Sequence, residues 1–240
     1  MTILKGRYNA ERYATSPISP NLTDKGLSHQ VKSKQRVADF GEVYTNEREV
    51  NAMLDLVKDQ ATNPDRTFLE PACGTGNFLV EILRRKLEAV AKRHKKIQID
   101  YELYAVISMS SLYGIDILED NVRECRKRLL AIFTQHYQSQ FPKTYQEKCI
   151  RSAEVILSKN ILHGDALELK TVKDKKDIVF TEWKPWRNQL QRRDFVYRNL
   201  VHNLSDSPEF SEDGKEEFIP TSIQAYPLIH FLEVGNDNTL

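Results

Sequence analysis

The chain has only three cysteines among its 240 residues: Cys73, Cys125 and Cys149. They are scattered and form no CxxC pair, which argues against a disulfide framework and against a clustered zinc site. We expect small buried or half-buried thiols in a reducing compartment, and hence a cytoplasmic protein. No metal site is expected.

Two further signals are missing. No apolar run approaches the roughly eighteen residues that suggest a transmembrane helix, and the N-terminal stretch MTILKGRYNAERYATSP lacks the apolar core of a signal peptide. The net charge is only +1, so no overall charge attracts the protein to nucleic acid or to an anionic membrane. We therefore expect a soluble protein that does not associate with membranes.

The sequence does contain an alternation of strand-like and helix-like segments. Apolar residues make up 40% of the chain, which is enough for a real core. Residues 1–35 are polar and show no sustained period, so we expect an N-terminal arm followed by one domain over residues 36–240. The expected strands are 67–70, 111–117, 161–167 and 177–183, and the expected helices are 46–59, 77–96, 101–110 and 120–137.

This order of elements predicts an α/β fold. We expect a Rossmann-like, mostly parallel twisted sheet with helices on both faces, preceded by the arm and a first helix. In such a sheet, ligands bind at the carboxyl ends of the strands. Candidate site residues should therefore follow the expected strands directly.

The stretch FLEPACGTGNF, residues 68–78, places such residues after the first strand. Gly74 and Gly76 allow a tight turn and a close approach to a ligand, and the helix that begins near Asn77 points its free amides at the same place. A dinucleotide is disfavoured, because Leu79 replaces the third glycine of that pattern and the Glu70 carboxylate would repel a pyrophosphate. A cationic ligand such as S-adenosylmethionine, with its ammonium and sulfonium groups, suits an acid beside a glycine turn.

Two aspartates follow the next two strands. Asp116 comes after Ile115, and its two acceptor oxygens match a vicinal diol. It could instead be a charge near the N-terminus of the following helix. Asp165 follows Gly164, and it is either a ligand-binding acid or simply a turn-forming residue.

The segment EPACGTGNF resembles motif I of the class I S-adenosylmethionine-dependent methyltransferases. The resemblance is closest to the adenine-N6 DNA methyltransferases that serve as modification subunits of restriction–modification systems. Three further segments fit this family in the expected order: GEVYTNEREVNAMLDLV at 41–57, YGIDILEDNVRECRKRL at 113–129 and NILHGDAL at 160–167. Together the similarity covers about residues 35 to 185.

The resemblance implies S-adenosylmethionine as cofactor. It assigns Asp116 to the ribose hydroxyls and Asp165 to the adenine amine, while Tyr44 and Thr45 match the family's N-terminal motif. The implied cofactor-binding residues are Tyr44, Thr45, Glu70, Pro71, Ala72, Gly74, Gly76, Asn77, Phe78, Asp116, Ile117, Asp165 and Ala166.

The catalytic motif of the family is missing. That motif is a tetrapeptide of Asn, Asp or Ser, then Pro-Pro, then an aromatic residue, and it closes the fourth strand. Here DIVF is followed by TEWKPW, and the chain has no Pro-Pro. By register, Glu182 stands near the polar position, and Trp183 or Trp186 would stack on the extruded base. The alternative is an ordinary strand end with two half-buried tryptophans.

The resemblance therefore implies a DNA adenine-N6 methyltransferase of a restriction–modification system. The alternative is a cofactor-binding but inactive partner subunit, and a third possibility is transfer to RNA, protein or a small molecule. We expect no separate target-recognition domain, so DNA should bind only weakly to this chain alone. A specificity or restriction subunit is a possible partner.

Overall fold

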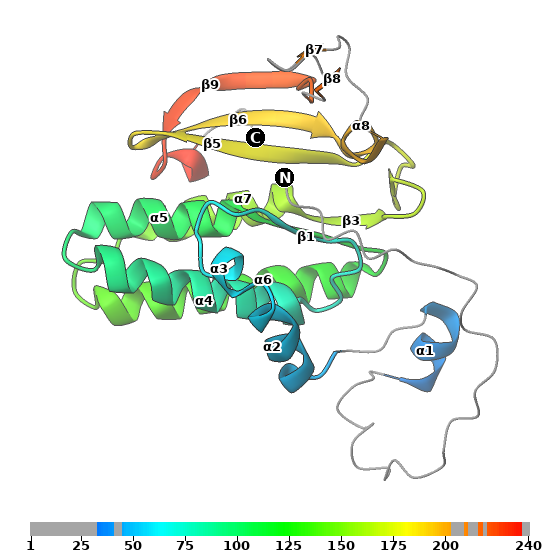
Figure 1. The fold of residues 1–240 in the computed structure, drawn as a ribbon, viewed down its shortest axis with the longest axis horizontal. Coiled ribbons are helices and arrows are strands. Elements are labelled where there is room, and N and C mark those ends of the chain that lie inside the picture. Colours follow the sequence, from blue (N-terminus) through cyan, green and yellow to red (C-terminus); the bar gives the residue numbers. More distant parts are fainter. Residues whose placement is uncertain (1–32, 41–44, 203–208, 211–215, 218–219, 237–240) are drawn as a thin grey trace.

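The computed structural model describes residues 33–40, 45–202, 209–210, 216–217 and 220–236 (Figure 1). Most of the expected N-terminal arm and Tyr44 lie outside these ranges, and the division into an arm and one domain stays a prediction. No helix in the described part of the chain is both long and apolar enough to cross a membrane.

A small, mainly parallel sheet forms the centre of the fold. Its strands are β1 (Phe68–Glu70), β2 (Leu112–Asp116) and β3 (Ile161–Asp165), in the order β1-β2-β3, and the short β4 (Lys170–Thr171) adds to β3 in antiparallel orientation. The predicted α/β class with a parallel sheet is confirmed.

The register of this sheet aligns the strand ends. Glu70 pairs with Gly114, and Asp116 pairs with His163. The carboxyl ends of β1, β2 and β3 therefore meet at one edge of the sheet, where a ligand site is expected.

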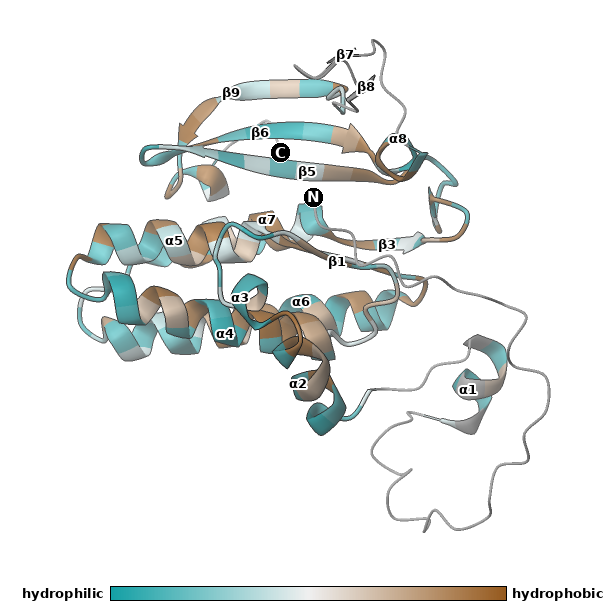
Figure 2. Ribbon diagram, viewed as in Figure 1, coloured by the Kyte–Doolittle hydropathy of each residue, from teal (hydrophilic) through white to brown (hydrophobic). Residues whose placement is uncertain are grey.

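Four long helices pack together on one face of the sheet. They are α4 (Asn77–His94), α5 (Gln98–Ser110), α6 (Glu119–Gln140) and α7 (Glu147–Asn160). Figure 2 shows hydrophilic and hydrophobic residues alternating along these helices, as expected for helices that cover a core.

Helix α4 illustrates this pattern. Leu79, Leu83, Leu87 and Val90 recur at helical spacing and are completely buried. Three basic residues occupy its last turn, where they complement the helix dipole. The helix is therefore fixed by its apolar face, and its N-terminus lies directly after the glycine turn.

The opposite face of the sheet is covered differently from the prediction. A second, antiparallel sheet, β5 (Val179–Trp186), β6 (Gln189–Val196) and β9 (Gln224–His230), lies on this side together with the short helix α8 (Tyr197–His202) (Figure 1). Tyr113 and Ile115 of β2 pack against Phe180 and Tyr197 in this layer. The expectation of helices on both faces is therefore not confirmed, because a second sheet lies on this side with only the short helix α8.

The expected fourth parallel strand is in fact β5. It pairs with β6 through a two-residue connection at 187–188, where Arg187 has a φ of +53°. A strand whose partner follows immediately can form a local hairpin. The sequence pattern did not indicate β6. Residues 177–183 were therefore expected to form a strand of the parallel sheet.

The remaining elements surround this framework. They are α1 (Lys34–Phe40), α2 (Glu47–Asp55), α3 (Lys58–Ala61), β7 (Glu209–Phe210), β8 (Glu216–Glu217) and η2 (Val234–Asn236). Asn46 caps α2, because its side chain accepts a hydrogen bond from the Arg48 amide at 2.8 Å.

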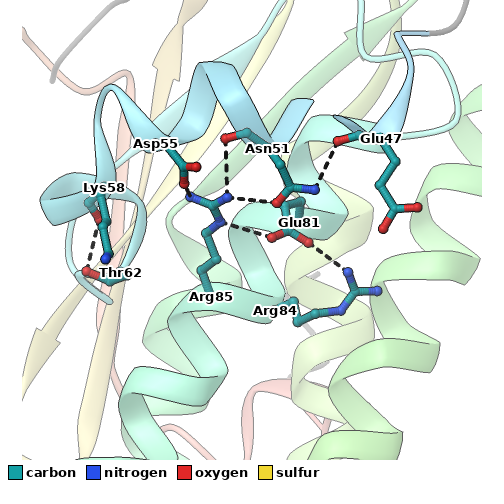
Figure 3. Close-up of polar contacts among 8 residues, drawn as sticks. All are labelled: Glu47, Asn51, Asp55, Lys58, Thr62, Glu81, Arg84 and Arg85. Carbon is teal, nitrogen blue, oxygen red and sulfur yellow. Dashed lines mark hydrogen bonds and ion pairs between the residues drawn. The ribbon is translucent and has the colours of Figure 1, made fainter. Parts of the chain in front are cut away.

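Helix α2 is held against α4 by one arginine (Figure 3). Arg85 donates to the side-chain oxygen of Asn51 at 2.8 Å, to Asp55 at 2.8 Å and to Glu81 at 2.9 Å. The apolar side of α2 is buried through Val50 and Leu54. These contacts fix the position of α2, and hence of the segment at its N-terminus, next to the first turn of α4.

Candidate cofactor-binding site

A pocket of about 480 Å³ lies at the carboxyl ends of β1, β2 and β3. It brings together residues from segments that are far apart in the sequence. Among the predicted cofactor-binding residues, the following line it: Thr45, Glu70, Pro71, Ala72, Gly74, Asn77, Phe78, Asp116, Ile117, Asp165 and Ala166.

Gly76 is not among the lining residues, and Tyr44 lies outside the described residues. Gly76 acts on the geometry of the turn instead. It has a φ of +86° at the N-cap of α4, and its amide donates to the Cys73 carbonyl at 2.7 Å. Gly74 also has a positive φ, +52°, so both glycines adopt backbone conformations that other residues rarely take.

Glu70 is the carboxyl group of the pocket with the most strongly shifted pKa. Its Oε2 atom is buried and has no hydrogen-bond partner among the described residues. Burial, and secondarily the negative charge of Asp116, raises the pKa of Glu70 from 4.5 to about 8. A buried acid of this kind favours a ligand that brings a positive charge or a hydrogen-bond donor.

Asp116 ties the glycine turn to β2. Its Oδ2 accepts a hydrogen bond from the Gly74 amide at 2.8 Å, and its Oδ1 accepts from Leu118 at 2.9 Å and from Asn121 at 3.2 Å. A carboxylate offers about four acceptor positions, so about one remains for a ligand hydroxyl. Asp116 therefore combines a structural role with the capacity to bind one.

Asp165 divides its oxygens in a similar way. Its Oδ1 accepts from the amides of Leu167 at 2.9 Å and Glu168 at 3.1 Å, which is the turn-forming role considered above. Its Oδ2 accepts no hydrogen bond from the described residues. Asp165 itself lines the pocket. Both interpretations of Asp165 are compatible with this geometry.

The sequence did not indicate several residues at the rim. Asp39, Leu118, Asn121 and Leu167 also line the pocket. Asp39 lies on α1. Arg36 of the same helix donates to the Asp120 carboxylate at 2.8 Å and to Asn121 at 3.2 Å. No local pattern marks this contact, because it joins segments more than eighty positions apart.

Arg128 of α6 was also missed, and it organises the glycine turn. Its Nη1 donates to the Thr75 carbonyl at 2.7 Å and to the Asn77 side-chain oxygen at 2.9 Å. The side-chain Nδ2 of Asn77 in turn donates to the Thr45 carbonyl at 3.0 Å. One guanidinium thus links α6, the turn and the segment before α2.

Replacing Arg128 with alanine should weaken cofactor binding about tenfold. Charge-assisted hydrogen bonds contribute about 1.5–3 kcal/mol, and because Arg128 holds the turn, only part of this free energy is lost from cofactor binding. Calorimetry measures the effect, with Arg123→Ala as control, since Arg123 is exposed on the same helix. Free guanidinium should restore part of the binding to Arg128→Ala. Unchanged affinity in a folded Arg128→Ala protein would show that the turn does not need this anchor.

The three residues predicted to be catalytic do not line the pocket. Glu182 forms an ion pair with Arg193 across the β5–β6 hairpin, with Nε 2.7 Å from the carboxylate. Trp183 is only 5% exposed and belongs to the helical core, whereas Trp186 is 62% exposed at the end of β5. The structure thus separates these side chains from one another and from the pocket, and their catalytic role stays a prediction.

The fold thus brings a glycine turn and three acids together in one pocket at the carboxyl ends of parallel strands. Comparison with known families identifies its class, a DNA methyltransferase of restriction–modification systems. The family model described as "MmeI, DNA-methyltransferase domain" matches residues 32–181, which is more than half of the chain, so the chain belongs to this family. No curated protein and no solved structure matches the chain.

The matched range confirms the family resemblance, since it includes all the segments on which that resemblance rests. It ends one residue before Glu182, where the catalytic tetrapeptide was expected. Nothing in the match favours the inactive-partner alternative.

Proposed function

We propose that the pocket binds S-adenosylmethionine and that the domain transfers its methyl group to the N6 amine of adenine in DNA. The observation that carries this proposal is the convergence of Glu70, Asp116, Asp165 and the glycine turn on one pocket at the strand ends. When bound, the cofactor supplies an electrophilic methyl group on a sulfonium.

The residues present fit this cofactor. The unpartnered Glu70 carboxyl offers an acceptor to the ammonium group, and ionisation of Glu70 would balance the ligand's positive charge. Asp116 has acceptor capacity left for a ribose hydroxyl. The free oxygen of Asp165 and the exposed Ile117 side chain offer an acceptor and an apolar surface to the adenine ring.

The protein's own residues would chiefly bind and orient the cofactor. Arg128 and Asn77 hold the turn, so that the helix α4 N-terminus faces the ligand. Glu182 does not line the pocket and is ion-paired with Arg193, and we keep it as the proposed acceptor for the amine protons. The setting that we propose is the cytoplasm, where the three buried cysteines stay reduced, and a specificity or restriction subunit is a further proposed partner.

Replacing Asp116 with alanine should weaken cofactor binding by about 1–3 kcal/mol, because it leaves polar partners unpaired. A cofactor analogue without the 2′-hydroxyl provides the matching deletion on the ligand. If Asp116 binds the ribose, the two losses should not add, because they remove the same interaction. Fully additive losses, measured by calorimetry, would assign Asp116 to the turn alone.

The decisive test of the reaction is transfer of labelled methyl from S-adenosylmethionine to unmethylated DNA. Glu182→Ala should abolish transfer while cofactor binding survives, and Glu182→Gln should preserve some transfer, because it keeps an acceptor oxygen. A protein that binds the cofactor but methylates neither DNA, RNA nor protein would overturn the proposed reaction and leave the inactive-partner function.

A further inference from the structure

The tip of the β5–β6 hairpin is an exposed surface outside the cofactor pocket. Lys184, Trp186 and Arg187 are all exposed there, and Trp186 is 62% exposed. An exposed aromatic side chain close in sequence to two exposed cations combines the groups that bind the bases and the phosphates of nucleic acids.

The charge of this segment has one sign. Residues 183–193, WKPWRNQLQRR, contain four cations and no carboxylate. Arg192 pairs with Asp194, and Arg193 pairs with Glu182. Within the described part of the chain, Lys184 and Arg187 have no carboxylate partner, so two positive charges at the tip remain for a partner.

The tip is also well supported. Strand pairing continues to the last residues before the turn, with Pro185 opposite Leu190 and Trp186 opposite Gln189, and β9 pairs with the other side of β6. Trp183 is buried beneath the ribbon, and the Asn188 carbonyl accepts from the Phe231 amide at 3.1 Å. Trp186 is therefore exposed on a fixed ribbon.

We propose that this hairpin tip binds the DNA substrate, with Lys184 and Arg187 contacting phosphates and Trp186 contacting a base. The inference rests on the proposed function, because it gives the DNA acceptor a place on the protein. Cations without counter-charges suit a polyanion, and an aromatic face stacks on any base. A two-stranded ribbon also has dimensions that fit the major groove.

The two tryptophans make this surface directly observable. They are the only ones in the sequence, and Trp183 is 5% exposed. Adding an unmethylated DNA duplex should quench the emission of Trp186 and protect it from acrylamide, and Trp186→Phe should remove this response. Heparin, a polyanion without bases, should bind without protecting Trp186.

Binding is then measured by the anisotropy of labelled duplex as a function of salt. The double variant Lys184→Ala/Arg187→Ala should bind more weakly and reduce the slope of log affinity against log salt by about 2, since each phosphate contact contributes about 0.9. Trp186→Ala should lower affinity about fivefold or more. Lys127→Ala is the matched control, because Lys127 is an exposed lysine on α6 in the helical layer.

The outcomes separate this inference from the proposed reaction. The hairpin assignment is overturned if the slope of log affinity against log salt is unchanged in the double variant. It is also overturned if duplex binds but leaves Trp186 unprotected. Both results count even if methyl transfer proceeds. The inference also fails if the wild type binds no DNA at low ionic strength, and a protein partner then becomes the occupant. DNA binding through the tip without methyl transfer would sustain the inference and refute the proposed reaction.

Discussion

Replacing Gly76 with alanine should lower the free energy of unfolding by about 2–5 kcal/mol and should abolish cofactor binding. A non-glycine residue in the left-handed conformation costs about 1–2 kcal/mol, and Gly76 has a φ of +86°. An added Cβ would also lie 2.6 Å from the Cys125 sulfur, and overpacking in a core costs about 1–3 kcal/mol.

The collision is not easily relieved, because Cys125 is completely buried on α6. The turn would have to shift instead, and Gly76 connects it to the first turn of α4 through the Val80 amide, which donates to its carbonyl at 2.8 Å. A displaced turn would move Gly74 and Asn77, both of which line the pocket.

Urea denaturation measures the stability, and calorimetry measures the binding. Cys125→Ala, alone and combined with Gly76→Ala, is the control, because it removes the sulfur that the new Cβ would meet. We expect the double variant to recover the steric part of the loss and to retain the backbone part. A single variant as stable as the wild type would contradict the need for glycine at this position.

The second large effect concerns Glu70 and pH. The pKa of this buried carboxyl is raised to about 8, whereas its ordinary value is 4.5. Between these values the folded protein holds a proton that the unfolded chain has lost, so stability falls as pH rises. The slope is about 1.4 kcal/mol per pH unit, and the total over the shift is on the order of 5 kcal/mol.

Glu70→Gln should lack this contribution. Without cofactor, the variant should gain stability over the wild type as pH rises from about 4.5 to 8, and the difference should then stay constant. Urea denaturation at a series of pH values, with cofactor omitted, measures the two curves. Parallel curves would show that Glu70 is solvated and ordinary.

Cofactor binding should shift Glu70 from its protonated form to its ionised form. An ammonium group beside the carboxyl favours its ionised form, so binding near pH 7 should release up to about one proton from Glu70. Calorimetry in two buffers of different ionisation enthalpy counts the protons. The ligand amine also titrates in this range, so the measured quantity is the difference between wild type and Glu70→Gln, which should bind about ten- to a hundredfold more weakly.

Much of the cofactor site could be predicted from short sequence patterns. Glu70, Asp116 and Asp165 each follow an apolar strand, and parallel strands bring such positions to one edge of a sheet. The glycine turn was readable for a similar reason, because positive φ angles favour glycine locally. These features depend on neighbouring residues along the chain, so one sequence was enough.

The second sheet was harder to predict from the sequence. The apolar segment of β5 was recognised as a strand, but its partner β6, with the sequence QLQRRDFV, contains the polar run QRRD and was not recognised. The structure shows why such a strand is stable: Arg192 and Asp194 form a buried ion pair, and Asp194 also accepts from Thr181 at 2.8 Å. Polar residues that pair with one another, within β6 and between β5 and β6, do not produce an apolar period.

By itself, the sequence determined the parallel strands, the glycine turn, the acids at the strand ends and the family. Tertiary structure alone decided that Arg128 holds the turn from 51 positions beyond Asn77, that Glu182 is paired with Arg193, and that Trp183 is buried while Trp186 is exposed. Periodicity and turn chemistry act between neighbours in the chain. Contacts between distant segments depend instead on strand register and helix packing, which only the folded structure fixes.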